Sequence, residues 1–284
     1  MSQNSYDSSP SLYLIPTPIG NMEDITMRAI NTLKLVDVIF CEDTRVTHQL
    51  LKNYDIHKKL VANHKFNEEE NKNKLLNYLN EGLNVGLVSD RGTPIINDPG
   101  YILAKTAIDN NYNVISLPGA SAFLCALTSS GISPMPFLYY GFLNNKKSKR
   151  IKELENLKFY KETIIFYEAP HRLLDTLNDM KLILGNNREC SISREITKKH
   201  EEIIRGNLGN IISKIENVKG EFVIVLEGNQ EKENYNEIDV SGHVNLYIEK
   251  GMKVMDAIKQ VSKDRNMKKS EVYNLYHNIE KRNK

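Results

Sequence analysis

Short strand-like runs alternate with helix-like stretches along almost the whole chain, and this alternation restricts the folds open to it. In the first half, runs rich in β-branched and aromatic residues begin at Ser11, Asp37, Lys59, Asn84 and Asn113. The stretches between them, such as 23–35 and 67–79, repeat apolar residues at helical spacing. Because strands that alternate with helices pair in parallel, the sequence predicts an α/β domain that ends near Gly119.

A second α/β domain is expected after this glycine. A helix-like segment follows it, and further strands are expected from Phe137, Glu162, Glu189 and Glu221, with helices at 172–184 and 208–215. The predicted divisions are a disordered N-terminus at 1–11, an N-terminal α/β domain at 12–118, a C-terminal α/β domain at 119–230, a linker at 231–241 and a helical extension at 242–284.

Basic charge is concentrated in this extension. The net charge of the chain is only +2, yet residues 249–284 hold ten lysines and arginines against five acidic residues. Two amphipathic patterns there, VMDAIKQVSKD and KSEVYNLYHNIEK, suggest a helix-turn-helix-like module. A second cluster consists of Lys146, Lys147, Lys149, Arg150 and Lys152. Such clusters are typical of RNA-binding surfaces, although a solvated face is an equal alternative.

Several classes of protein are excluded or disfavoured. No stretch approaches the roughly 18 consecutive apolar residues of a membrane span, and the first residues lack the features of a signal peptide, so we expect a cytoplasmic protein without a membrane partner. Cys41, Cys125 and Cys190 lie far apart with no CxxC, which argues against disulfides and against a metal site. The phosphate-binding GxxxxGK[ST] and dinucleotide-binding GxGxxG patterns are absent.

Three loops rich in glycine and proline each follow a predicted strand. They are PTPIGN from Pro16, SDRGTP from Ser89 with NDPG close behind, and LPGASA from Leu117. Loops at the carboxyl ends of parallel strands line the ligand crevice of an open α/β sheet, and glycine allows close approach of the backbone. The third loop leads into a helix near Ser121, whose free N–H groups could hold a carboxylate such as that of S-adenosylmethionine. Taken singly, each loop could instead be an ordinary turn.

These loops and five further motifs resemble the ribosomal RNA small subunit methyltransferase I family of the tetrapyrrole-methylase superfamily. The further motifs are EDTR (42–45), YGFL (140–143), IFYEAPHRL (165–173), REITK (194–198) and GEFVIVLEG (220–228). The match spans 12–228, and the basic tail resembles the C-terminal extension of the family. Two positions depart from the family pattern, since Arg91 stands for the usual alanine of SDAGTP and Ala120 for the last proline of LPGP. Arg91 is therefore expected to point away from a sulfonium ligand or to pair with an acid.

The resemblance implies a homodimer of two α/β domains with S-adenosylmethionine in the cleft between them. It also implies methyl transfer to the 2′-oxygen of a cytidine in the decoding region of 16S ribosomal RNA, within the small ribosomal subunit and not on DNA. The residues it assigns to the cofactor are Pro18, Gly20, Asp90, Gly92, Thr93, Pro94, Gly119, Ser121 and Ala122.

Candidates for a general base and for RNA contacts come from the same motifs. A ribose hydroxyl is a poor nucleophile, so a nearby base would help, and the candidates are Glu42, Asp43, Glu168 and His171. Asp43 could instead pair with Arg45, and His171 could cap the helix after it. Candidate RNA contacts are Arg45 as a phosphate anchor, Lys146, Lys147, Lys149, Arg150, Arg172 and Arg194, of which the last two could be structural ion pairs. Two other functions remain open, a methylase of a tetrapyrrole precursor and a non-catalytic RNA-binding protein.

Overall fold

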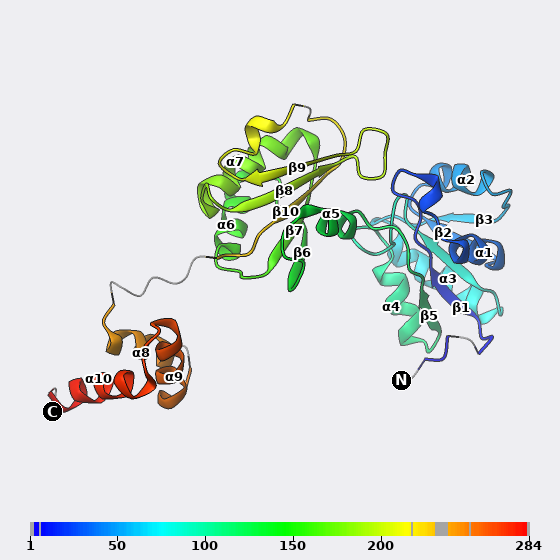
Figure 1. Cartoon of the computed structure of the whole chain (residues 1–284). Helices are drawn as coiled ribbons and strands as arrows, with labels where there is room; N and C mark the ends of the chain where they lie inside the picture. The colour runs from blue at the N-terminus through cyan, green and yellow to red at the C-terminus, as the bar shows by residue number, and fades with distance from the viewer. Residues whose placement is uncertain (1–2, 6, 217, 231–237, 250, 283–284) are drawn as a thin grey trace. The chain divides into compact units, whose positions relative to one another are not determined.

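The structure, a computed structural model, describes residues 3–5, 7–216, 218–230, 238–249 and 251–282 (Figure 1). The chain divides into two units, Met1–Asn229 and Gln230–Lys284. The first unit contains two five-stranded sheets, and the second is helical.

The first sheet is parallel throughout. Its strands are β1 (Ser11–Leu14), β2 (Val38–Cys41), β3 (Lys59–Ala62), β4 (Val85–Val88) and β5 (Asn113–Ser116), in the order β3-β2-β4-β1-β5. The helices are α1 (Met27–Leu35), α2 (Thr44–Lys52), α3 (Glu68–Asn80) and α4 (Tyr101–Asp109). In β2, Ile39 packs into one buried cluster and its neighbour Phe40 into another, so both faces of the sheet are covered. The predicted α/β layering is confirmed here.

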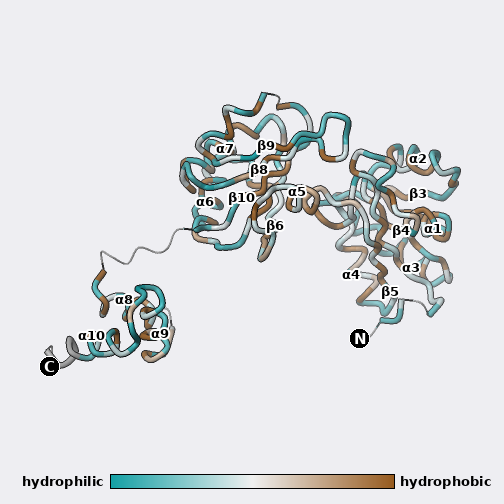
Figure 2. Tube along the Cα trace, viewed as in Figure 1, coloured by the Kyte–Doolittle hydropathy of each residue, from teal (hydrophilic) through white to brown (hydrophobic). Residues whose placement is uncertain are grey.

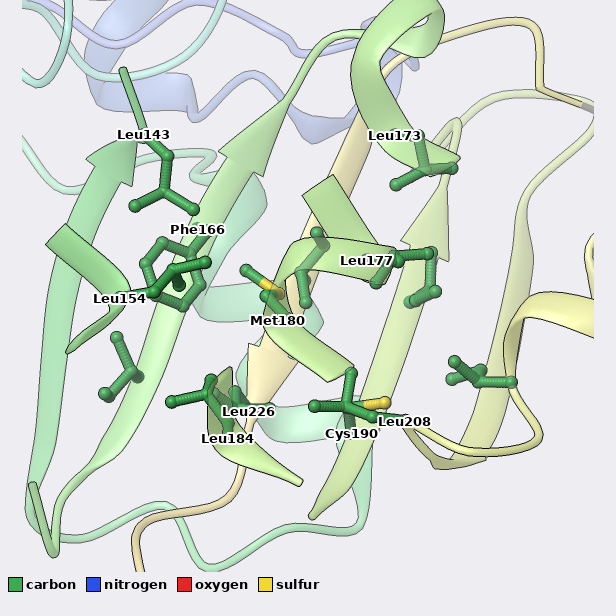
Figure 3. Packing of buried hydrophobic residues seen from close by; sticks show 14 of the residues in the cluster. Leu143, Leu154, Phe166, Leu173, Leu177, Met180, Leu184, Cys190, Leu208 and Leu226 are labelled. Carbon is green, nitrogen blue, oxygen red and sulfur yellow. The ribbon is translucent and has the colours of Figure 1, made fainter. Parts of the chain in front are cut away.

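The second sheet is mixed. Its strands are β6 (Phe137–Phe142), β7 (Thr163–Glu168), β8 (Glu189–Arg194), β9 (Glu202–Asn207) and β10 (Phe222–Leu226), in the order β6-β7-β10-β8-β9, with only β6 and β7 parallel. Figure 3 shows Phe166 of β7 and the α7 (Leu173–Leu184) side chains Leu177 and Met180 within one buried cluster on one face. Helix α5 (Ala122–Ser130) packs against the other face through Ala126 and Leu127. Figure 2 shows hydrophobic segments along the strands of this sheet and of the first sheet.

In the two α/β domains, four helices and strands were not expected from the sequence. They are α2, α4, β9 and α6 (Lys147–Leu157). Helix α6 contains the basic cluster from Lys147 to Lys152, and Lys146 directly precedes it. The segment packs as a helix because Leu154 and Leu157 give it a buried side. Where a helix was expected at 208–215, only the short 3-10 helix η3 (Ile212–Lys214) is present. Two other 3-10 helices are η1 (Met22–Asp24) and η2 (Pro170–Arg172).

The segment expected to be a disordered N-terminus makes defined contacts where the structure describes it. The side-chain amide of Asn113 donates to the carboxylate of Asp7, and Gln3 hydrogen-bonds to the backbone of Val114. Strand β1 begins at Ser11, inside the segment expected to be disordered. Of the expected linker, residues 231–237 lie outside the described residues, and its last residues already belong to α8 (Val240–Glu249).

The second unit consists of three described helices where two were expected. Helix α8 is followed by α9 (Val254–Asp264) and α10 (Lys269–Arg282). Val244, Ile258, Val261 and Val272 form a buried cluster of their own, so the extension has a separate core. Among the described residues no helix is long and apolar enough to cross a membrane.

The three cysteines are unpaired thiols. Cys41 and Cys190 lie in the cores of the two sheets, whereas Cys125 is exposed on α5. Burial raises the pKa of Cys41 to about 11 and that of Cys190 to about 12.

Candidate active site

Three loops meet at the carboxyl edge of the parallel sheet. The backbone N–H of Thr17 donates to the carbonyl of Gly92 at 2.9 Å, and the N–H of Gly92 donates back to Thr17 at 3.1 Å. The hydroxyl of Thr93 donates to the carbonyl of Ala120 at 3.1 Å, which joins the third loop to the second. The loops after β1, β4 and β5 therefore form one continuous wall.

The loop after β4 has an unusual backbone. Gly92 and Gly100 have positive φ, and so do Ile95 at 77° and Asn97 at 68°. A β-branched residue rarely adopts this conformation, and such outliers persist where neighbouring structure enforces them. The buried carboxylate of Glu68, on α3, accepts hydrogen bonds from the N–H groups of Gly100 at 2.6 Å and Ile102 at 3.1 Å. One end of the loop is thereby held in place.

A first cavity, of about 390 Å³, opens beside this wall. Four of the residues assigned to the cofactor line it, namely Gly92, Thr93, Ser121 and Ala122. Its larger apolar side chains include Ile19, Ile96, Phe142, Phe222 and Val223. Helix α5 begins at Ala122, so a helix N-terminus with N–H groups that lack partners within the helix faces the cavity.

A second cavity, of about 860 Å³, adjoins the first. Pro18, Gly20 and Asp90 line this one, together with Asp43 and Arg45. The residues assigned to the cofactor are therefore divided between two cavities, which the sequence did not indicate. Pro94 and Gly119 are in the lining of neither.

Arg91 lines both cavities and forms an ion pair with Glu221, which lines the first. Glu221 also accepts a hydrogen bond from Lys198 at 3.0 Å, and Lys198 in turn contacts Glu195 at 2.8 Å. The expectation that Arg91 would pair with an acid is met by this network.

Two candidate bases are engaged in other contacts. Asp43 caps α2 and accepts two hydrogen bonds from the guanidinium of Arg45, which hold the pKa of its carboxyl down to about 2. Glu168 is buried and accepts hydrogen bonds from Arg172, from the hydroxyl of Thr176 at 2.6 Å and from its own following N–H. A carboxylate whose lone pairs are all taken, or whose pKa is so low, is a poor proton acceptor. These contacts disfavour both residues as the base, although Glu168 lines the first cavity and Asp43 the second.

Three of the arginines expected to contact RNA are engaged in ion pairs. Arg150 is 4% exposed and pairs with Asp179 at 2.6 Å, so it cannot reach a phosphate. Arg172 pairs with Glu168, and Arg194 with Glu202 at 3.0 Å, which fits the alternative of structural ion pairs. By contrast, Lys146, Lys147 and Lys149 are exposed on or beside the first turn of α6. His171 is exposed in η2, lines neither cavity and makes no capping bond to α7.

Three acids remain close to one another beside the first cavity. Burial, and then the charges of Glu42 and Asp90, raise the pKa of Asp98 to about 6. Burial and the charge of Asp90 likewise raise the pKa of Glu42. Asp98 lines the first cavity, so it combines access with a pKa near neutrality.

Sequence reasoning had not selected Asp98, although it lies in the NDPG segment that follows the second loop. Tyr167 and Glu221 of the first cavity were also missed, because Tyr167 lies in β7 and Glu221 directly before β10, where no loop pattern distinguishes them. Among the described residues no group of histidine, cysteine and carboxylate side chains is arranged to hold a metal ion.

Comparison with known proteins bears on this site. The family model of Tetrapyrrole (Corrin/Porphyrin) Methylases matches residues 11–212. The chain belongs to this family. It is also 48% identical over 285 aligned positions to "Ribosomal RNA small subunit methyltransferase I" of Bacillus subtilis (strain 168), with 98% of this chain and 97% of that protein covered. This likeness places the chain in the group that bears that name.

Solved structures agree with the fold. The crystal structure of the methyltransferase CobJ matches with a TM-score of 0.58 at 17% identity, and covers 78% of this chain and 95% of its own. Uroporphyrin-III C-methyl transferase from Thermus thermophilus, complexed with S-adenosyl homocysteine, matches with a TM-score of 0.53 at 18% identity, over 76% and 96%. The two-domain α/β architecture of the tetrapyrrole methylases is thus confirmed for the first unit.

Proposed function

We propose that this chain transfers a methyl group from S-adenosylmethionine to the 2′-oxygen of a cytidine in the decoding region of small-subunit ribosomal RNA. The observation that carries the proposal is the first cavity, whose walls match the parts of this cofactor. Support for the RNA substrate comes from the name of the relative given above and from its 48% identity over nearly the whole chain.

The first cavity suits the cofactor in three respects. Aliphatic and aromatic side chains such as Ile96 and Phe142 offer a surface for adenine. The N-terminus of α5 offers the backbone N–H of Ala122 to a carboxylate, while the N–H of Phe123 donates to the hydroxyl of Tyr167 at 3.2 Å. The carboxylates of Asp98 and Glu221 complement the positive charges of a sulfonium and an ammonium group.

The cofactor, when bound, supplies an electrophilic methyl group for an in-line displacement. The chain must align the ribose hydroxyl with that methyl group, and rigid loops serve this purpose, because positioning supplies much of the acceleration in such reactions. Asp98 is the base that we propose in place of Asp43 and Glu168. With a pKa of about 6 it is largely ionised at pH 7 and still basic enough to accept the hydroxyl proton.

The partners follow from the same proposal. The substrate is 16S ribosomal RNA within the small subunit, in the cytoplasm, and DNA is excluded because it lacks the 2′-hydroxyl. We also propose a homodimer, for which the support is the resemblance to the family.

Incubation with methyl-labelled S-adenosylmethionine and undermethylated small subunits tests the function. Digestion of the RNA to nucleosides should place the label in 2′-O-methylcytidine, and sedimentation of the purified protein should give the mass of a dimer. Label on a base, or transfer to a tetrapyrrole precursor in preference to RNA, would refute the proposed reaction.

A further inference from the structure

In the function proposed above the cofactor occupies the first cavity, which leaves the second cavity for another ligand. It adjoins the first cavity through Arg91, which lines both. The oxygen that accepts a methyl group must lie next to the methyl donor, so a substrate site has to border the cofactor site. The second cavity meets this requirement.

One side of α2 forms a large part of this cavity. Its members, Arg45, Val46, Gln49, Leu50 and the adjacent Asn53, are spaced by three or four residues and so share a face of the helix. Thr47 and Leu51 are buried in the domain on the other side. The helix is therefore fixed by one face and presents the other to the cavity.

This face carries the groups that recognise a nucleotide. The side chain of Arg45 is 89% exposed, and Asp43 orients it through bonds to Nε and Nη2 that leave Nη1 uninvolved. The side-chain amides of Gln49 and Asn53 make no hydrogen bonds within the described part of the chain, and an amide can pair with the edge of a base. Val46 and Leu50 supply apolar surface for a ribose or a base.

The charges that line the second cavity also restrict the net charge of the ligand that it can bind. Its three cations are Arg45, Arg91 and Lys198, and its three carboxylates are Asp43, Asp90 and Glu195. A polyanion such as an acidic macrocycle needs an excess of cations, whereas a single nucleotide presents one phosphate beside a neutral sugar and base. The balanced lining favours the nucleotide.

We propose that the second cavity binds the target ribonucleotide, turned out of its RNA, with its phosphate on Arg45 and its base edge on Gln49 and Asn53. Its ribose then lies toward the first cavity, which Asp98 lines. This rests on the proposed function, in that the nucleotide bound here is the one methylated. Extrusion into a pocket is the usual way for an enzyme to reach one nucleotide of a folded RNA.

Filling the cavity tests the proposal. Val46→Trp places a large ring in it, and Leu182→Trp places the same ring on α7, where Leu182 is 73% exposed and lines neither cavity. The double variant Gln49→Ala, Asn53→Ala removes the amides without adding bulk. For each protein we would measure cofactor affinity by calorimetry, binding of a cytidine-containing single-stranded oligoribonucleotide by fluorescence anisotropy, and KM for undermethylated subunits.

We expect Val46→Trp and the double variant to weaken oligoribonucleotide binding and raise KM at least about tenfold, with cofactor affinity and the Leu182→Trp protein unchanged. Wild-type KM and oligoribonucleotide affinity in both cavity variants would overturn the nucleotide site and leave the methyltransferase proposal standing. A third outcome is that the wild-type protein binds the oligoribonucleotide, the cavity variants bind it more weakly, and no subunits are methylated. This outcome would overturn the proposed reaction and leave the nucleotide site standing. A wild-type protein that neither binds the oligoribonucleotide nor methylates subunits would overturn the nucleotide site and the proposed reaction together.

Discussion

Gly119 packs directly against Pro16. A β-carbon on Gly119 would lie 2.4 Å from Cβ of Pro16 and 2.8 Å from its Cγ. The glycine was expected to let the backbone approach the cofactor, but it lines neither cavity. The absence of a side chain at Gly119 lets the loop after β5 pack directly against the loop after β1. This contact fixes the distance between the two loops.

A side chain at this position should therefore separate the two loops. We expect Gly119→Ala to cost about 1–3 kcal/mol of stability, as overpacking usually does, and to weaken binding of S-adenosylmethionine. Calorimetry and denaturant unfolding would measure both effects. The partner variant Pro16→Gly, which removes the clashing atoms, should restore part of the loss in the double variant. Independent, additive effects of the two changes would show that this contact is not the cause.

The proposed base predicts an acidic limb in the pH profile. The pKa of Asp98 is raised to about 6, so its ionised form is lost as the pH falls through that value, and kcat/KM should fall with it. Asp98→Asn should lower kcat by about two to four orders of magnitude and abolish this limb. Glu42→Gln removes a charge that raises the pKa of Asp98, so the limb should move to lower pH. Initial rates between pH 5 and 8 would measure the position of this limb in each protein. An unshifted limb in Glu42→Gln would contradict the assignment of Asp98 as the base.

Glu68 is expected to stabilise the loop that carries Asp98 through its hydrogen bonds to the backbone. Removal of its carboxylate leaves the N–H groups of Gly100 and Ile102 without their acceptor, so Glu68→Ala should cost about 1–3 kcal/mol and weaken cofactor binding. The neighbour Glu69 is exposed and pairs with Lys72, so Glu69→Ala should change stability by less than about 1 kcal/mol. Thermal unfolding and calorimetry of the two variants provide a matched comparison. Equal effects in both would remove any special role of Glu68.

The basic extension is expected to serve RNA affinity. Lys253, Lys259, Lys263, Lys268 and Lys269 are all exposed on or between its described helices. Cations that neutralise phosphates release counterions, so truncation at residue 232 should raise KM for subunits and flatten its salt dependence, with cofactor affinity unchanged. Steady-state kinetics at two salt concentrations would show this. A large fall in kcat at constant KM would mean that the extension helps to build the active site.

The sequence predicted the layers of the fold better than the contents of the site. Strands such as β2 and β10 are continuous apolar runs, and buried strands of this kind are recognisable from residue types alone. Strand β9 was missed because it lies at the edge of its sheet, where most of its residues stay partly exposed and the apolar pattern weakens.

Site residues were harder to predict because their roles depend on partners far away in the sequence. Arg150 looked like part of a surface cluster until its buried partner Asp179 was known. Asp98 looked like an ordinary turn residue, since neither its burial nor the nearby charge of Glu42 is visible in the local sequence. The glycine and proline loops were recognisable because their backbone requirements are local.

The position of Cys125 offers a way to observe the site directly. It is the exposed one of the three cysteines, and its N–H donates at 3.2 Å to the carbonyl of Ser121, which lines the first cavity. Because the other two thiols are buried in the cores of the two sheets, a maleimide dye should attach to Cys125 without any change to the sequence. Partial burial also raises the pKa of the Cys125 thiol, so labelling should be faster in mildly alkaline buffer. A fluorophore placed there, one helical turn from the cavity, would report occupancy of the first cavity by its emission in real time.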